Sequence, residues 1–155
     1  MPHDAIIIGG SYAGLSAAMQ LARAGRSVCV VDSDTPRSRF AAASHGFFGQ
    51  DGAAPRAMIA QAREKLLAYP NVHFVGGTAI HAHAIPDGFA VDLGMGETLQ
   101  AAKLVLAFGV VDELPDIPGL AGKWGKSVLH CLYCHGYEFK GRRLGALNVM
   151  EKSVH

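Results

Sequence analysis

The chain reads AIIIGGSYAG from Ala5 to Gly14. The apolar, β-branched run at its start is typical of a strand buried in a parallel sheet. Glycines directly after such a strand let backbone N–H groups approach a phosphate at the start of a helix. Apolar residues then follow helical spacing as far as Ala24, and Gly25 is placed to end the helix. The stretch therefore predicts the first half of a βαβ nucleotide-binding unit.

A second apolar stretch, residues 27–32, ends on the acidic side chain of Asp32. An acid at this place accepts hydrogen bonds from ribose hydroxyls in folds that bind dinucleotides. The glycine pattern is imperfect because Ser11 occupies the position of its second glycine, but serine is small and its hydroxyl can donate to a phosphate. We therefore predict a dinucleotide site. The competing interpretation is an ordinary tight turn followed by an exposed acid.

The rest of the chain predicts further elements of an α/β sheet. Residues 33–52 are polar and glycine-rich and predict a long loop. Pro55 suits the first turn of a helix that reaches Tyr69. Further strands are expected at 72–75 and 103–107, with a small antiparallel meander over 78–99. The predicted fold class is α/β, a Rossmann-like βαβ parallel sheet with a small antiparallel β insertion.

A connector punctuated by proline and glycine predicts a boundary between two parts. We predict a nucleotide-binding part over residues 1–112, a linker over 113–124, and a dithiol segment over 125–155. The last segment would also contain the beginning of a second, truncated domain. Its first strand is expected at 144–150.

Composition and charge narrow the function classes. Half of the 155 residues are apolar, 19 are glycine, and the formal net charge is +1. Because neither sign of charge forms a long run, we expect neither nucleic acid nor a membrane as the partner. The apolar run at 5–8 is too short for a signal peptide, so we expect a cytoplasmic protein. Three cysteines cannot build a disulfide framework.

The hexapeptide HCLYCH at 130–135 predicts a redox centre. Cys131 and Cys134 are spaced to open and close a disulfide, and His135 can give or accept the proton. Three alternatives stay open for this motif: c-type haem attachment, a zinc site, and a reduced pair with a structural role. We predict no metal ligand.

The other cysteine and two histidines are assigned no role. Cys29 lies inside an apolar strand, where a lone cysteine behaves as a small hydrophobic residue. His81 and His83 would share one face of a strand. Without a third ligand, that face is expected to be a solvated edge.

Several motifs together resemble a known family. IIGGSYAGLSAA at 7–18, Pro-Arg at 36–37, Ser-His-Gly at 44–46 and CLYCHGYE at 131–138 look like the thioredoxin reductase-like branch of the FAD-dependent pyridine nucleotide-disulfide oxidoreductases. The resemblance covers essentially the whole chain. It implies that NADPH reduces FAD, that FAD reduces the cysteine pair, and that the dithiol reduces a partner disulfide, or that electrons flow in reverse.

The resemblance also implies roles for individual residues. Cys134 would face the flavin, Cys131 would attack the substrate, and His135 would protonate the leaving thiolate. The partner would be a thioredoxin-like protein or a small-molecule disulfide. The residues that match the family's FAD contacts are Gly9, Gly10, Ser11, Ala13, Gly14, Asp32, Ser33, Arg37, His45, Ala79, Ala107 and Gly109.

Four departures from the family pattern shape the expected activity. Phe108 stands where the family usually has threonine beside FAD, and Leu132 replaces a frequent proline between the cysteines. Residues 148–152 lack the glycine of the family's NADPH loop. The fourth departure is length, since the family's chain is about twice as long. We therefore expect the N-terminal part of an oxidoreductase, which binds FAD weakly and does not reduce FAD with NADPH unaided.

Two other functions remain possible from the sequence. One is a non-catalytic nucleotide-binding fragment or subunit that needs a companion chain. The other is a small zinc-binding protein. A homodimer is the alternative to a companion chain.

Overall fold

A computed structural model describes residues 3–148 and divides the chain into two compact units. The first unit comprises 1–39 and 56–110, and the second comprises 40–55 and 111–155. Among residues 3–148, every helix is too short or too polar to cross a membrane.

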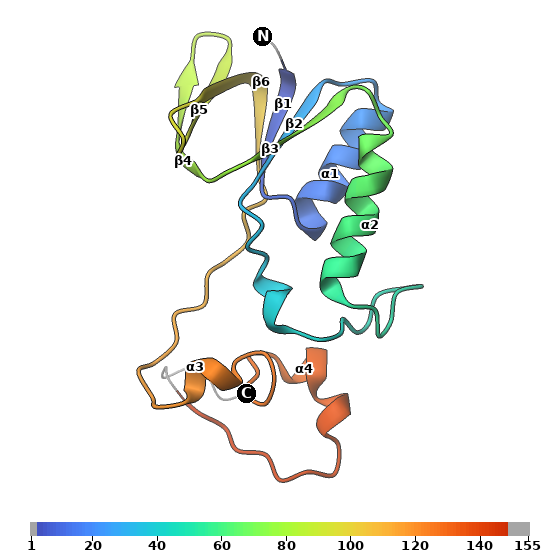
Figure 1. The fold of residues 1–155 in the computed structure, drawn as a ribbon, viewed down its shortest axis with the longest axis vertical. Coiled ribbons are helices and arrows are strands. Elements are labelled where there is room, and N and C mark those ends of the chain that lie inside the picture. The colour runs from blue at the N-terminus through green and yellow to red at the C-terminus, as the bar shows by residue number, and fades with distance from the viewer. Residues whose placement is uncertain (1–2, 149–155) are drawn as a thin grey trace. The chain divides into compact units, whose positions relative to one another are not determined.

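The first unit is built on one six-stranded sheet with the order β3-β2-β1-β6-β5-β4. Its parallel strands are buried because apolar β-branched residues fill them, as expected when both faces are covered. Helices α1 and α2 lie against one face of the sheet (Figure 1). The elements run β1 His3–Ile8, α1 Tyr12–Arg23, β2 Val28–Asp32, α2 Pro55–Leu67 and β3 Val72–Gly76.

The antiparallel meander consists of β4 Ala79–Ile85, β5 Gly88–Leu93 and the first part of β6 Thr98–Leu106. Strand β6 pairs antiparallel with β5 over Thr98–Ala101 and parallel with β1 over Ala101–Leu106. The strand predicted at 103–107 therefore begins five residues earlier, because its amino-terminal half is recruited by the meander.

Two apolar clusters hold the first unit together. On the helix side, Leu15 and Leu66 pack against the buried side chains of Ile7 and Val30. On the opposite side, the cluster unites Ile6, Cys29 and Val31 of the parallel strands with Val91 and Leu93 of β5. The meander thus covers the face that the helices leave open.

The second unit contains short helices joined by turns. Its elements are α3 Leu120–Lys123, α4 Leu132–His135 and η2 Tyr137–Phe139, and a 3₁₀ turn, η1 Arg37–Phe40, precedes the 40–55 segment. Gly125 has φ +71, and a Cβ there would lie 2.6 Å from the Cβ of Phe40, so segments distant in sequence meet closely.

One predicted strand is wrong in the part that the structure describes. Residues 144–148 have no strand structure, and residues 149 and 150 of that prediction lie outside the described residues. Leu144 and Leu147 are 62 % and 55 % exposed. An apolar run without a neighbouring strand to pair with does not form a strand on propensity alone.

Candidate functional site

The turn between β1 and α1 requires glycine for steric reasons. A Cβ on Gly9, whose φ is +108, would collide with the carbonyl oxygen of Ala107, and one on Gly14 would collide with the carbonyl oxygen of Gly9. A Cβ on Gly10 would lie 2.6 Å from Oδ2 of Asp32. The turn is therefore closed tightly against the ends of β2 and β6, and its backbone is left uncovered by side chains of its own.

These residues meet because parallel strands end at the same edge of a sheet. The backbone N–H of Gly9 donates to Val31 and that of Ala107 donates to Ile8, at 2.8 Å each. Asp32 is the last residue of β2 and stays partly exposed beside Gly10. The carboxyl edge of an open α/β sheet is where such folds bind ligands.

The start of α1 suits an anion. Ser11 is the N-cap, and within the described residues its hydroxyl makes no hydrogen bond that caps the helix. The first turn holds no acidic side chain, while Arg23 lies in the last turn. Because the first turn has no acid, the positive end of the helix dipole is available to an anion such as a pyrophosphate, while Arg23 complements the negative end. The glycine turn, the helix start and the Asp32 carboxylate together fit a dinucleotide cofactor.

The other cofactor residues predicted from the sequence lie in different parts of the structure. Ala107 and Gly109 follow β6 beside the glycine turn, and Gly109 has φ +70. Ser33 directly follows Asp32, and its Oγ lies 2.7 Å from Oγ1 of Thr35. Ala79 begins β4, and Arg37 is exposed on η1. His45 belongs to the second unit.

Phe108 does not fill the turn with its ring. Its side chain is 68 % exposed, although its Cα lies 3.0 Å from the position of a Gly9 Cβ. The backbone of Ala107 and Phe108 therefore lies against the turn, while the Phe108 side chain is largely exposed.

In the second unit, the thiols of Cys131 and Cys134 lie side by side and are not joined in a disulfide. Their Sγ atoms are 2.8 Å apart, and the backbone N–H of Cys134 donates to Sγ of Cys131 at 3.3 Å. A hydrogen bond to sulfur stabilises negative charge on it, and the thiolate is the reactive form. The neighbouring Leu132 and Tyr133 are 71 % and 96 % exposed. The pair is accessible and close enough to close into a disulfide after a small movement.

A polar cluster surrounds the histidine that follows the dithiol. The rings of His135 and His45 meet edge to face with centroids 6.2 Å apart. Nε2 of His45 lies 3.4 Å from Oε1 of Glu138, and its Nδ1 lies 3.5 Å from Oδ1 of Asp51. Two carboxylates thus flank the His45 ring, which in turn contacts His135.

Sequence reasoning assigned no role to Glu138 or Asp51. Glu138 is inside the quoted CLYCHGYE motif, and that position was the available signal. The sequence gives no signal for Asp51, because its contact with His45 depends on the turn of residues 44–53. In that turn the backbone N–H of Gly52 donates to the carbonyl oxygen of Ser44.

Cys29 is a packing residue. Its side chain is fully buried in the second apolar cluster. Burial, with a smaller contribution from Glu97, raises the pKa of the Cys29 thiol to about 11. A buried neutral thiol at this place is unsuited to electron exchange.

His81 and His83 are both exposed, as expected for a solvated strand edge, but the sequence did not reveal the third potential ligand beside them. Both lie on the edge strand β4, but Asp92 of β5 approaches them. Within the described part of the chain, these three residues form the only group of three potential ligands with mutually close atoms. The zinc alternative therefore gains no support at the dithiol.

Comparison with known proteins gives a consistent result. The sequence pattern of the family described as pyridine nucleotide-disulphide oxidoreductase matches residues 3–149. A thioredoxin reductase of Claviceps purpurea is 42 % identical over 149 residues, which is 94 % of this chain and 46 % of the relative. A thioredoxin reductase of Leptosphaeria maculans is 34 % identical and is covered to 47 %.

The fold matches solved structures equally well. An oxidoreductase from Agrobacterium tumefaciens superposes with a TM-score of 0.86 at 51 % identity, over 90 % of this chain and 48 % of that protein. The chain thus spans about half the length of the relatives it matches.

Proposed function

Because the chain belongs to the pyridine nucleotide-disulphide oxidoreductase family, we propose that it carries the FAD-binding turn and the redox dithiol of an NAD(P)H-linked thiol-disulfide oxidoreductase. In this proposal residues 1–112 bind FAD. Residues 113–124 form a linker to residues 125–155, which carry the dithiol and the beginning of an NADPH-binding domain. The companion parts that bind NADPH and complete the flavin pocket lie outside this chain.

The observation that carries the proposal is the 2.8 Å separation of the Cys131 and Cys134 sulfurs on an exposed segment. A dithiol with a structural role would not need exposed sulfur, and Cys29 of the same chain shows how a buried cysteine differs. An adjacent histidine, His135, supplies the proton donor that disulfide opening needs.

Residues of the first unit would hold the cofactor. Backbone N–H groups at the start of α1 would face the pyrophosphate, and Asp32 would accept hydrogen bonds from the ribose hydroxyls. The remaining proposed contacts are those of Ser33, Arg37, His45, Ala79, Ala107 and Gly109. Bound FAD would supply the two-electron exchange with the cysteine pair.

The dithiol would exchange electrons with a partner disulfide in two steps. The Cys131 thiolate attacks one partner sulfur, the partner S–S bond breaks, and His135 protonates the leaving thiolate. His135 then takes the proton of the Cys134 thiol, and the Cys134 thiolate attacks Sγ of Cys131. The bond between Cys131 and the partner breaks, and the second partner sulfur leaves as a thiolate that takes this proton from His135. The partner gains two electrons and two protons, and Cys131 and Cys134 end as a disulfide.

The contacts of His45 bear on the protonation of His135. Glu138 and Asp51 hold the His45 ring, and that ring contacts the ring of His135 edge to face. A fixed neighbour limits the orientations of the His135 imidazole and so aims its proton. We include His45 and Glu138 as positioning residues for proton transfer.

The partner class follows from the exposed dithiol and from the relatives, which are named thioredoxin reductases. We propose a thioredoxin-like protein or a small-molecule disulfide as the electron partner, in the cytoplasm, with neither nucleic acid nor membrane involved. A homodimer or a companion chain is the proposed assembly.

The experiment that tests the proposal is an FAD fluorescence titration of the purified chain. Asp32→Asn should weaken FAD binding by about tenfold or more, because a charge-assisted hydrogen bond to ribose is lost. Asp34→Asn is the matched control, since Asp34 is exposed two residues away and pairs with Arg56 at 3.6 Å. Equal affinities for both variants would refute the assigned site.

A second arm separates the catalytic proposal from a non-catalytic subunit. Chain loaded with FAD and reduced by dithionite should reduce an added aromatic disulfide, and Cys131→Ser should abolish that reaction while retaining FAD. Retention of FAD with no dependence on Cys131 would favour the non-catalytic nucleotide-binding subunit instead.

A further inference from the structure

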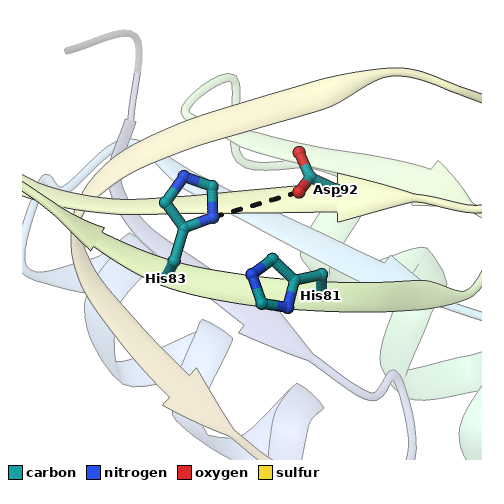
Figure 2. A group of neighbouring side chains, drawn as sticks. All are labelled: His81, His83 and Asp92. Atoms are coloured by element: carbon teal, nitrogen blue, oxygen red, sulfur yellow. Dashed lines mark ion pairs between the residues drawn. The ribbon is translucent and has the colours of Figure 1, made fainter.

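His81, His83 and Asp92 converge on one side of the β4–β5 pair. Figure 2 shows the two imidazoles on alternate positions of β4, with the Asp92 carboxylate from β5 next to the His83 ring. Strand β4 is an edge of the sheet, so this side of it is open to solvent. The group lies outside the glycine turn and outside the dithiol unit.

The strand register explains why these residues meet. Alternate residues of a strand share a face, which puts His81 and His83 together. A register shift between Ala79 and His81 pairs Ala79 with the buried Leu93 and pairs His81 with Asp92. A regular ladder through Ala79 would have placed Leu93 on the histidine face. The bulge therefore places the polar Asp92, instead of an apolar residue of β5, on the same face as the histidines.

The geometry is close to that of a three-ligand metal site. The nearest potential ligand atoms of the three residues all lie within 4.8 Å of one another. Nδ1 of His83 is 3.9 Å from Oδ2 of Asp92, and the two imidazoles stack with centroids 5.3 Å apart. Ligands of a tetrahedral zinc ion lie about 3.3 Å apart. The group must therefore contract by up to about 1.5 Å, which the exposed rings can do by side-chain rotation.

A neighbouring hydroxyl orients the carboxylate. Oγ1 of Thr98 on β6 donates to Oδ1 of Asp92 at 2.6 Å. This leaves Oδ2 directed at the histidines. Hydrogen bonds of this kind hold the ligands of metal centres in place and raise affinity.

We propose that His81, His83 and Asp92 bind a divalent first-row transition ion, with Zn²⁺ as the ion of choice. Imidazole and carboxylate suit zinc, and three protein ligands leave the fourth position for water at this exposed edge. The ion would fasten edge strand β4 to β5. The inference is independent of the flavin proposal.

The test is a calorimetric titration of ZnCl₂ into the 155-residue chain carrying Cys131→Ser and Cys134→Ser. These substitutions remove the thiols that would otherwise compete for zinc. We expect saturable binding of about one ion per chain. Absence of binding by this background would overturn the proposal.

Variants then locate the ion. His83→Ala should weaken binding at least tenfold, and Asp92→Asn should do the same while keeping the shape of the side chain. His73→Ala is the matched control: His73 is an exposed histidine on β3, at the opposite edge of the same sheet. The ring of His73 lies 5.5 Å from the ring of His3, centroid to centroid. The His73→Ala variant therefore also tests whether this other histidine pair binds the zinc.

The Thr98→Val substitution tests the orienting hydroxyl without touching a ligand. It should weaken zinc binding about tenfold, as expected for a residue that acts through a ligand. Circular dichroism checks that each variant is folded. Unchanged affinity in both His83→Ala and Asp92→Asn, or loss of binding in His73→Ala alone, would place the ion elsewhere and overturn the assignment.

Discussion

Each of the two units of this chain is stabilised internally by a different kind of contact. Apart from Pro55 and Leu120, the buried apolar residues in the described part belong to the first unit. The second unit relies on turns, backbone hydrogen bonds and the His45 contacts with Asp51 and Glu138. The proposed cofactor turn therefore stands on a well-packed scaffold, while the proposed redox sulfurs lie on a segment with little core of its own.

The largest effect should come from breaking the core of the first unit. Val30 is fully buried on β2. Val30→Asn would bury an amide without partners and should lower the free energy of unfolding by about 3–5 kcal/mol. Urea denaturation followed by circular dichroism measures this.

Leu132→Asn is the control from the other unit, because Leu132 is 71 % exposed. We expect a change within about 0.5 kcal/mol. If the two substitutions destabilise equally, the contrast between the units is wrong.

The second largest effect is expected from a substitution in the glycine turn of the first unit. Gly10→Ala places a Cβ where Asp32 Oδ2 would be 2.6 Å away, so the carboxylate must move. We expect FAD affinity to fall about tenfold or more with a loss of stability near 1 kcal/mol. Gly145→Ala, where nothing lies within 4 Å of a Cβ, should leave both unchanged; FAD fluorescence and urea denaturation decide.

Thiol labelling compares the units by chemistry. With a pKa of about 11 and no exposed surface, Cys29 should react with iodoacetamide at pH 8 at least about 100-fold more slowly than Cys131 or Cys134. Mass spectrometry of the reduced chain over a time course gives the three rates. Comparable labelling of Cys29 would mean that the first unit opens readily.

The smallest expected effect concerns pH and the first strand. Burial, and then the neighbouring His73, lowers the pKa of His3 from its usual 6.5. The unfolded chain then binds the proton more tightly, so His3 makes stability fall as pH drops from above 6.5 toward the folded pKa. His3→Gln should flatten the pH dependence of urea unfolding in that window. A slope identical in the variant would contradict this.

Local patterns predicted the first half of the sheet well. Alternation and apolar runs fix the strands, and Gly25 at φ +73 ends α1 as its position indicated. Asp32 was expected at a strand end because the strand–turn–helix order leaves few alternatives. These features depend on residues near one another in sequence.

Features that depend on distant partners were missed. The dual pairing of β6 needs β1 and β5 as neighbours, which no local pattern reveals. Likewise, Asp92 became a third ligand only through the register shift in β4. The contact between segment 40–55 and the dithiol segment joins residues about ninety positions apart, as between His45 and His135.

Strand β1 lies between β2 and β6 in the sheet. In the sequence, β6 begins about ninety residues after β1 ends. During synthesis, the ribosome therefore delivers β1, α1 and β2 long before β6 emerges. Until then one hydrogen-bonding side of β1 has no neighbour and exposes a template for other chains. A nascent chain arrested before Thr98 would thus be prone to aggregate, and chaperone demand should end abruptly once Leu106 has left the exit tunnel.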